Sequence, residues 1–260
     1  MASVSSNDLI IYGSANMRET DSSSQGGIVD TTTRIVFTDI VPSASVLKIS
    51  SSASGDTSQT LTITGRDSSG AIVTDALSLN GTSTVTGTKS YERVLKIVLS
   101  GTCAGTVTVI DSEGSPNTVV AIEAGVTTIR RPFYNVSADA TGGSPRNFYE
   151  KIFVKNTNAT NALLSASIVE ASDGTEAVSA DVTFDLEVTG NGGNTSTNRE
   201  TAPAGADMLG SPTFNDTSKN MPGTDLGPGD AIGVWLKLNL PAGTAATNTT
   251  FTLRASGSTT

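Results

Sequence analysis

The sequence contains no histidine and a single cysteine, Cys103. Without histidine, the chain cannot build a Ser-His-Asp triad, a Cys-His dyad, or a zinc or haem site with histidine ligands. A single cysteine excludes an intrachain disulfide and a thiolate cluster. We therefore expect no cofactor, no metal and no enzymatic activity, and we expect Cys103 to be a bystander because no base is available to activate its thiol.

Charged and aromatic residues are also scarce, at 16% and 5% of the 260 residues. The formal net charge is −9, and an acidic chain is a poor nucleic-acid ligand because phosphate contacts need a basic surface. No apolar run approaches the roughly 18 residues of a membrane helix. The first ten residues lack the basic and apolar regions of a secretory signal. We therefore expect no nucleic-acid partner, no membrane association and synthesis in a reducing cytoplasm.

Ser and Thr are abundant and make up about 28% of the chain, whereas typical compositions are led by Leu, Ala and Gly. Polar and apolar residues alternate within residues 60–64, 105–109, 182–188 and 250–254. Alternating β-branched residues suit half-buried strands, and clusters of Gly, Asn, Asp and Ser separate these runs at short intervals. The pattern predicts an all-β fold with short connections.

One segment of the chain is repeated. Residues 46–50 (VLKIS) recur as residues 94–98 (VLKIV), an offset of 48 positions (94 minus 46). An alternating strand follows each copy, and then a turn that begins with Asp and ends with Gly, at residues 67–70 and 111–114. Repetition of a supersecondary unit at this distance predicts two related halves of one β-sandwich.

The composition along the chain predicts three parts. Residues 1–33 are expected to form an extended N-terminal arm, because their polar stretch cannot bury enough surface to fold alone. Residues 34–114 and 118–260 are expected to form two β-sandwich domains, separated by turn residues and Pro116. The second domain contains a long loop at residues 189–229, and loops of that length are often functional or ordered by a partner.

Three carboxylates occur at even spacing along one predicted strand. Asp181, Asp185 and Glu187 therefore share one face of that strand. Paired carboxylates can hydrolyse glycosidic bonds at separations of roughly 5 to 10 Å, or they can bind a cation. We favour a third interpretation, in which these residues form the solvated outer face of the strand opposite its apolar side chains.

Three turn-like motifs resemble binding loops only in part. The Asp-to-Gly stretches at residues 67–70 and 111–114 resemble fragments of a calcium loop, but neither continues into the twelve-residue ligand pattern. Asp at the first position and Gly at the last favour a β-turn instead. Residues 191–194 (NGGN) lack the Lys-Ser/Thr and the following helix of a phosphate loop. We expect ordinary turns at all three places.

The only tryptophan, Trp235, lies in a strand-like run at residues 232–240. The even-numbered positions of this run are apolar and should face the core, which places Trp235 on the other face with Gly233 and Lys237. A large aromatic side chain on an outer face is often an interface anchor. The alternative is that the long loop at residues 189–229 covers it, and the sequence favours neither interpretation.

A small basic and aromatic cluster occupies residues 130–134 (RRPFY). Arg and Tyr are enriched at protein interfaces, and the cluster is therefore a candidate contact region, although simple packing of a strand end would also explain it. The candidate contact residues are Arg130, Arg131, Phe133 and Tyr134.

Several stretches resemble structural proteins of tailed bacteriophages. Residues 7–17 (NDLIIYGSANM) look like the start of uncharacterised proteins of that kind. Residues 61–70 (LTITGRDSSG), with residues 77–81 and 91–94, resemble Ig-like β-sandwich modules in phage virion proteins, and residues 226–254 are similar in style. Together these stretches cover much of the chain, and they contain no catalytic signature.

The resemblance implies an all-β, non-enzymatic protein of two Ig-like β-sandwich domains with an extended N-terminal arm. It implies a capsid decoration (cement) protein that is made in the host cytoplasm and binds the major capsid protein on the surface of the virion head. By analogy, decoration proteins of this kind associate with themselves as dimers or trimers.

The expected mechanism is burial of interface area together with strand addition by the arm. The arm residues expected to contact the partner are Ile10, Ile11, Tyr12 and Met17. Trp235 is a further candidate contact residue. The alternatives are a tail, neck or baseplate component of the virion, a surface adhesin or carbohydrate-binding module, and a glycosidase that uses Asp181, Asp185 or Glu187.

Overall fold

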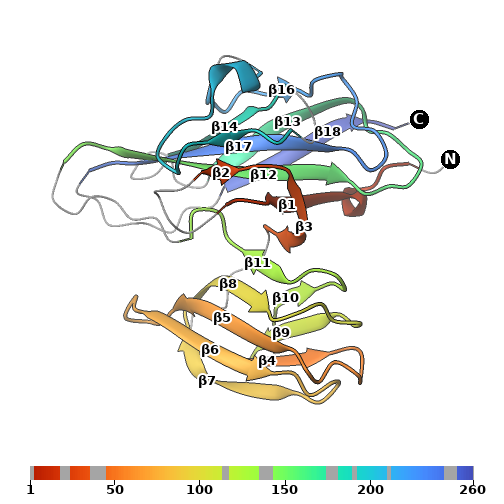
Figure 1. The fold of residues 1–260 in the computed structure, drawn as a ribbon, viewed down its shortest axis with the longest axis vertical. Helices are drawn as coiled ribbons and strands as arrows, with labels where there is room; N and C mark the ends of the chain where they lie inside the picture. Colours follow the sequence, from red (N-terminus) through yellow and green to blue (C-terminus); the bar gives the residue numbers. More distant parts are fainter. Residues whose placement is uncertain are drawn as a thin grey trace. The chain divides into compact units, whose positions relative to one another are not determined.

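The structure is a computed structural model that describes residues 3–17, 24–35, 45–112, 117–134, 143–173, 181–188, 192–209, 212–242 and 251–259 (Figure 1). In these residues the only helical elements are two 3-10 turns, η1 (Ser6–Asp8) and η2 (Gly205–Asp207), and the other regular elements are β-strands. The prediction of an all-β chain is therefore confirmed. Strands dominate because polar residues, often Thr, alternate with apolar residues such as Val and Ile along most of the described segments.

The chain divides into two compact units. Unit 1 consists of Met1–Asp30 and Asn135–Thr260, and unit 2 consists of Thr31–Tyr134. Unit 2 is therefore inserted into unit 1, and both ends of the chain belong to the same unit. The boundary expected around Pro116 falls inside unit 2, between two strands that pair with each other.

Unit 2 contains two sheets. Its strands are β3 (Val29–Arg34, which begins at the end of the first segment of unit 1), β4 (Ser45–Ser51), β5 (Thr60–Arg66), β6 (Ile72–Ser78), β7 (Val85–Tyr91), β8 (Arg93–Leu99), β9 (Val107–Asp111), β10 (Thr118–Ile122) and β11 (Thr128–Arg130). One sheet has the strand order β3-β11-β8-β5-β6, and the other has the order β10-β9-β4-β7. All described pairings are antiparallel except β3 with β11.

The sequence repeat is visible in the pairing of these two sheets. Strand β4 of the first copy pairs with β9 of the second, and β8 of the second copy pairs with β5 of the first. The registers are equivalent, because Ile49 lies opposite Val109 in one sheet and the corresponding Ile97 lies opposite Ile63 in the other. The two copies therefore form related halves of one two-sheet unit, as the repeat predicts, and each half contributes one central strand to each sheet.

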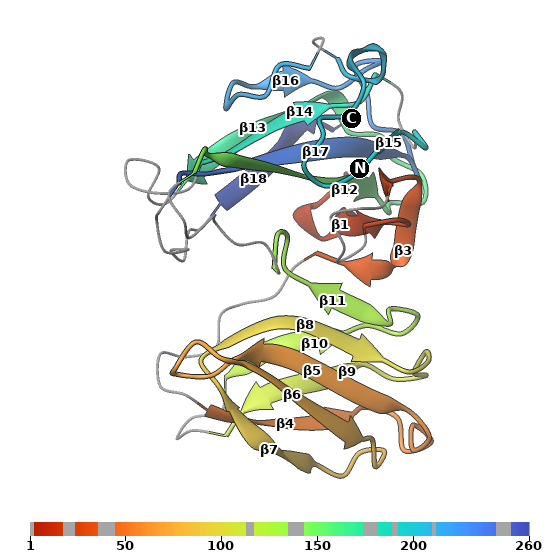
Figure 2. The same ribbon diagram turned by 60° about the vertical axis from the view of Figure 1, so that its left-hand side comes forward.

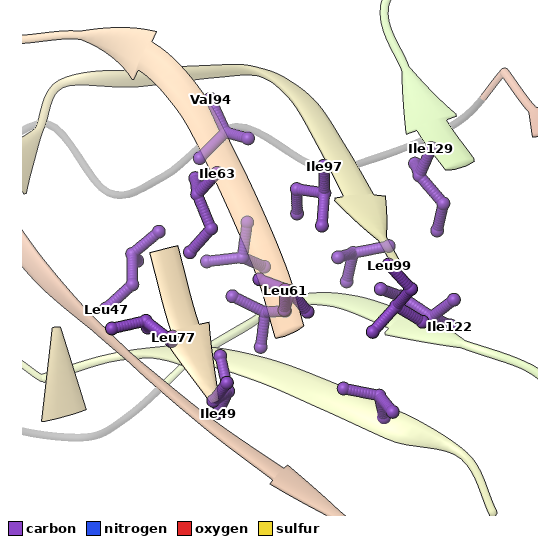
Figure 3. Close-up of a cluster of buried hydrophobic side chains, with 14 of the residues drawn as sticks. Leu47, Ile49, Leu61, Ile63, Leu77, Val94, Ile97, Leu99, Ile122 and Ile129 are labelled. Carbon is purple, nitrogen blue, oxygen red and sulfur yellow. The ribbon is translucent and has the colours of Figure 1, made fainter. Parts of the chain in front are cut away.

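The core of unit 2 lies between its two sheets. Side chains from both sheets, among them Ile49 of β4, Ile63 of β5 and Ile97 of β8, point toward one another (Figure 3). These three side chains are at most 1% exposed. Their alternation with solvent-facing residues along each strand is the period-2 pattern of the sequence, since successive strand residues point to opposite faces.

Unit 1 contains one four-stranded sheet and smaller sheets. Its strands are β1 (Leu9–Ser14), β2 (Gln25–Gly26), β12 (Arg146–Asn156), β13 (Leu164–Asp173), β14 (Asp181–Leu186), β15 (Thr195–Ser196), β16 (Lys219–Asn220), β17 (Ala231–Leu240) and β18 (Phe251–Ser258). The four strands of the larger sheet run in the order β14-β17-β12-β1 (Figure 2). Strands β16, β13 and β18 form a second sheet, and β15 pairs with β2.

The N-terminal segment is not an extended arm in this structure. Strand β1 pairs antiparallel with β12 from Leu9 opposite Asn156 to Gly13 opposite Ile152, and β2 pairs with β15. The polar composition of residues 1–33 suggested that they could not fold alone, which remains a sound argument. Strands β1 and β2 pair instead with strands that lie more than a hundred positions later in the same chain, and local composition does not reveal such long-range pairing.

Candidate functional site

Two carboxylates of β14 and its C-terminal extension are buried. Asp185 is 1% exposed and Glu187 is fully buried, so the expected solvated outer face is a wrong prediction for these two residues. Asp181, at the start of the strand, is half-buried. The opposite face of the strand is covered as well, because Phe184 and Leu186 are both fully buried. Both faces of β14 therefore pack inside unit 1.

The strand registers bring the buried charges together on one face of the larger sheet. Lys151 of β12 lies opposite Trp235 of β17, and Asp185 of β14 lies opposite Trp235 from the other side. Glu187 follows β14 and donates its backbone N–H to the carbonyl of Gly233, which is two residues from Trp235. Because paired residues and residues two positions apart share a face, these side chains converge above the central strand β17.

Lys151 and Glu187 form an ion pair that is closed off from solvent. Nζ of Lys151 lies 2.6 Å from Oε1 of Glu187, and both side chains are 0% exposed. Trp235 donates its indole N–H to the same Oε1 at 2.9 Å. The ammonium also lies 4.8 Å from the ring centre of Phe153 and 5.9 Å from that of Trp235. Aromatic faces attract a cation at such distances, so the lysine is held by a carboxylate and two rings.

Burial opposes the charged form of both partners. Desolvation lowers the pKa of Lys151, although the charge of Glu187 and its hydrogen bond act in the other direction. Desolvation also raises the pKa of Glu187, against the opposing effects of Lys151 and Trp235. Loss of hydration is the larger effect for each group, as expected when two ions leave water together.

Residues of the long loop and of the N-terminal segment cover this pair. Nζ of Lys151 donates to the backbone carbonyls of Gly192 at 2.6 Å and Asn194 at 3.2 Å. The carbonyl of Asn194 also accepts the N–H of Gly27 at 2.9 Å. The residues expected to form a simple flexible turn at 191–194 therefore include two ligands of the buried ammonium. Asn191 itself lies outside the described residues.

Glycines make room for the cluster. A Cβ on Gly233 would collide with the carboxylate of Glu187 and would lie 3.0 Å from Cε of Lys151. A Cβ on Gly26 would lie 2.6 Å from the carbonyl oxygen of Asn194 and 3.0 Å from the indole ring of Trp235. Gly26 also has a φ of +105°, a conformation that other residues rarely adopt. A side chain therefore cannot be accommodated on either side of the buried pair, at Gly233 of β17 or at Gly26 of β2.

A second buried carboxylate is neutralised nearby. Oδ1 of Asp185 lies 3.7 Å from Nζ of Lys219, and the Asp185 carboxylate accepts backbone N–H groups of Leu186 at 2.9 Å and Thr213 at 2.8 Å. The lysine additionally donates to Oδ1 of Asn215 at 2.8 Å. These contacts hold the edge of β14 against residues 213–219. Those residues belong to the long loop at residues 189–229, which the sequence predicted to be functional or ordered by a partner.

Trp235 is 0% exposed and packs with Tyr149, Met208, Ala202 and Phe214. Three of these neighbours belong to the loop at residues 189–229. The long loop therefore covers Trp235, which was the alternative to an interface anchor. Trp235 is unavailable as an exposed contact residue. The alternation of residues 232–240 was predicted correctly, but burial of the second face depends on the loop.

The cluster at residues 130–134 packs against β8 of unit 2. Arg130 is 5% exposed. Arg131 donates its Nε–H to the carbonyl of Val94 at 2.9 Å, and Tyr134 lies with its ring centre 5.8 Å from Nζ of Lys96. Phe133 has a left-handed φ of 52°. These contacts are those of a strand end that packs on its neighbour, which was the alternative to an interface.

The predicted arm residues are half-buried. Ile10, Ile11 and Tyr12 lie in β1 opposite Lys155, Val154 and Phe153 of β12. Met17 is also half-buried, and its Sδ lies 3.4 Å from the backbone nitrogen of Lys151. Their pairing partners are in the same chain, so contact with another protein is not needed to explain their apolar character.

The remaining sequence motifs of unit 2 have structural roles. Asp67 accepts hydrogen bonds from the backbone of Ser69 at 2.9 Å and Ala71 at 3.0 Å, and Gly70 has a φ of +81°. The first Asp-to-Gly stretch is therefore a turn, as predicted. Burial raises the pKa of the Cys103 thiol, which is the opposite of the shift that activates a nucleophile. The second stretch, at residues 111–114, lies partly outside the described residues.

Neither a metal cluster nor a membrane helix is found in the parts that the structure describes. No group of three or more His, Cys, Asp and Glu residues is placed to hold a metal ion there. No helix within those same segments is long and apolar enough to cross a membrane.

Sequence reasoning missed Lys151, which is central to the buried cluster. The available signal was a charged pair, Glu150 and Lys151, inside the otherwise apolar and aromatic run of residues 148–154 (FYEKIFV). A charged residue in such a run is either at a strand edge or paired in the interior. Only the register with β17 and the position of Glu187 distinguish these two cases.

Comparisons with known proteins add little to this geometry. No family model and no curated protein match the chain. Among solved structures, the D431N mutant VP2 protein of infectious bursal disease virus in T=1 particles is 14% identical, with 96% of this chain and 67% of that chain covered and a TM-score of 0.18. The structure of the Gx strain of that virus is 12% identical, with 97% of this chain and 70% of that chain covered and a TM-score of 0.15. These TM-scores are too low for the likeness to support any statement about the fold or function of this chain.

Proposed function

We propose that this chain is a non-enzymatic structural protein of a tailed-phage virion, and specifically a capsid decoration protein that binds the major capsid shell. The observation that carries the proposal is the resemblance of three separate stretches to phage virion proteins. In the structure these stretches lie in β1, in the hairpin of β5 and β6, and in β17 and β18. Both units therefore contain a part of the resemblance, and we extend it to two Ig-like sandwich modules.

The buried charges favour this structural role over the glycosidase alternative. Asp185 and Glu187 are both at most 1% exposed, and each lies within 4 Å of a lysine ammonium. A glycosidase needs two carboxyl groups that flank a bound sugar. Carboxylates that are sealed beneath a loop and neutralised by lysine instead stabilise the packing between strands and loop.

The position of β1 changes the expected binding mechanism. Because β1 is already paired with β12, strand donation by the N-terminus does not account for attachment to a capsid. The contact surface is better sought among exposed side chains. Among the described residues, the exposed large apolar side chains are Ile28, Ile72, Val188 and Leu209. The first two are the most exposed, at 59% and 55%, and they lie in different units.

Location in the particle is the first test. Antibody raised against this chain is applied to intact virions, and bound antibody is visualised with gold. We expect gold over the whole head surface, because decoration proteins are present in many copies. Gold confined to the tail, neck or baseplate would overturn the decoration role in favour of a tail component. Absence of gold from particles that are shown to be intact would overturn a virion role altogether.

Binding to the shell is the second test. Heads assembled without this protein are mixed with purified chain and sedimented, and the bound amount is quantified. We expect saturable co-sedimentation, with the Ile28→Glu or Ile72→Glu variant reducing it at least tenfold. The matched control is Ser68→Glu, which adds the same charge at an exposed turn position. Equal binding by all variants would contradict a contact through either isoleucine.

A further inference from the structure

Nζ of Lys151 and the carboxyl group of Glu187 are in direct contact, with 2.6 Å between Nζ and Oε1, and both side chains are 0% exposed. We propose that they become joined by an intramolecular amide (isopeptide) bond between Nζ of Lys151 and Cδ of Glu187. The two residues lie on opposite sides of β17, and their side chains meet above Gly233. The bond would connect β12 to the segment that follows β14 and would close a loop of 36 positions (187 minus 151).

The two oxygens of Glu187 are held differently. Oε1 accepts the indole N–H of Trp235 at 2.9 Å and lies 2.6 Å from Nζ of Lys151. Oε2 is buried, and it has no hydrogen-bond partner among the described residues. A buried carboxylate oxygen without a partner is costly if it carries charge. It is much less costly as the hydroxyl of a neutral acid, which is the form from which water can leave.

Burial shifts both groups toward the reactive protonation states. Desolvation lowers the pKa of Lys151 and raises the pKa of Glu187, and the charge of Asp207 further raises the pKa of the carboxyl group. Transfer of one proton from the ammonium to the carboxylate converts the pair into a neutral amine and a neutral acid. This exchange needs no outside proton donor, and it removes both charges from the interior.

The reaction balances within the pair. The lone pair of Nζ attacks Cδ, and the negative charge that develops on Oε1 is stabilised by the N–H of Trp235, as in an oxyanion hole. A proton moves from Nζ to Oε2, the bond between Cδ and Oε2 breaks, and Oε2 leaves as water. No oxidant, reductant or cofactor is consumed. Groups that are held in a reactive arrangement have effective concentrations of about 10⁵–10⁸ M. The pair is also closed off from bulk solvent, which favours amide formation over the hydrolysis that prevails in solution.

Mass spectrometry of the purified full-length chain tests the proposal. We expect an intact mass below the sequence mass by the mass of one water molecule, after allowance for removal of Met1. Proteolysis followed by tandem mass spectrometry is expected to yield one branched peptide that contains both Lys151 and Glu187. This peptide map is decisive by itself, because it does not require any variant to fold.

Two variants control for other losses of water. Asp173 is followed by glycine, and such a pair can lose water by succinimide formation. Lys151→Met cannot form the bond but retains that pair, so we expect it to show the full sequence mass. Lys237→Met removes a half-buried lysine of the neighbouring strand β17 and should keep the loss of water.

The proposal is overturned by a wild-type mass equal to that of the sequence. It is also overturned if the water loss persists in Lys151→Met or if the peptide map places it elsewhere. These results concern the purified chain alone. They are therefore independent of whether the protein decorates a capsid.

Discussion

Trp235 donates its indole N–H to Oε1 of Glu187 across 2.9 Å, and both side chains are fully buried. The two residues come from β17 and from the segment after β14, which are 48 positions apart (235 minus 187). The contact therefore reports directly on whether the larger sheet of unit 1 and its covering loop are assembled.

Tryptophan fluorescence should follow the folding of unit 1 alone, because Trp235 is the only tryptophan in the chain. We expect the native protein to resist quenching by acrylamide, and its emission to move to longer wavelength when urea unfolds it. Native emission that is quenched as readily as that of free tryptophan would contradict the burial of this residue beneath the loop.

Gly233→Ala should destabilise unit 1. Its Cβ would collide with the carboxylate of Glu187 and approach the stem of Lys151, and overpacking of a close-packed interior costs about 1–3 kcal/mol. Urea unfolding followed by Trp235 fluorescence measures the effect. The control is Gly193→Ala in the same unit, where a Cβ meets only Cγ2 of Ile28 at 3.6 Å, an ordinary contact. Equal unfolding midpoints for the two variants would show that the space above β17 is not restricted.

Asp56→Asn should destabilise unit 2 near neutral pH and have less effect in acid. Hydrogen bonds from Ser51 at 2.6 Å, Ala104 at 2.9 Å and Gly105 at 3.0 Å hold the pKa of the Asp56 carboxyl below its ordinary value. A carboxyl whose pKa is lower when folded stabilises the protein above its unfolded pKa of about 3.9. That stabilisation disappears as the pH falls through the folded pKa.

Circular dichroism during urea unfolding at pH 7 and at acidic pH measures this difference. The matched control is Glu92→Gln, an exposed carboxyl of the same unit, which should change the midpoint little at either pH. A loss of stability for Asp56→Asn that is equally large at low pH would show that the ionised form of Asp56 is not the one that stabilises the fold.

Asp75→Ala should destabilise unit 2 where β6 and β7 are the edge strands of its two sheets. The Asp75 carboxylate of β6 accepts the backbone N–H groups of Thr88 at 2.6 Å and Lys89 at 3.3 Å, where the register of β7 shifts against β4. We expect a cost of about 1–2 kcal/mol, since hydrogen bonds to a charged acceptor are worth more than neutral ones.

Chemical denaturation of Asp75→Ala, Asp75→Asn and Thr74→Ala compares these effects. Asparagine keeps one acceptor oxygen, so Asp75→Asn should lose less stability than Asp75→Ala. Thr74 is exposed on the same strand, and Thr74→Ala is therefore the neighbouring control. If Asp75→Ala and Thr74→Ala unfold at the same denaturant concentration, the carboxylate does not stabilise β7.

Deletion of residues 1–14 should destabilise unit 1 because it removes β1 from the edge of β12. We expect the Trp235 unfolding transition to move to lower urea or to lose its cooperativity. Deletion of residues 1–4, which precede η1, is the control and should leave the transition in place. An unchanged transition after the longer deletion would indicate a free arm rather than a strand.

Two sequence features predicted parts of the fold correctly: the alternation of polar and apolar residues, and the internal repeat. Polar and apolar residues alternate in β5, β9 and β14 because successive strand residues face opposite sides. The VLKI repeat correctly indicated two related halves, since equal sequences favour equal registers. What the repeat could not reveal was the exchange of partners, with β4 on β9 and β5 on β8.

The candidate site could be predicted only in part. Even spacing correctly placed Asp185 and Glu187 on one face, and the alternation of β17 correctly placed Trp235 opposite the apolar side chains. The burial of these side chains could not be inferred, because it depends on residues within 192–209 and 212–214 and on Gly26 covering that face. A carboxylate on an uncovered strand face is solvated, whereas the same carboxylate under a loop needs a lysine.

The sequence by itself determined the chemical character of this protein: an acidic, Ser- and Thr-rich chain of alternating strands that lacks histidine. These properties depend on residue identity and near-neighbour spacing, which are local. Tertiary structure alone decided that unit 2 is inserted in unit 1, that Leu9 pairs opposite Asn156, and that Lys151 meets Glu187. Such contacts join residues far apart in the chain, and they exist only because distant strands gain more by burying their faces together than they lose in chain entropy.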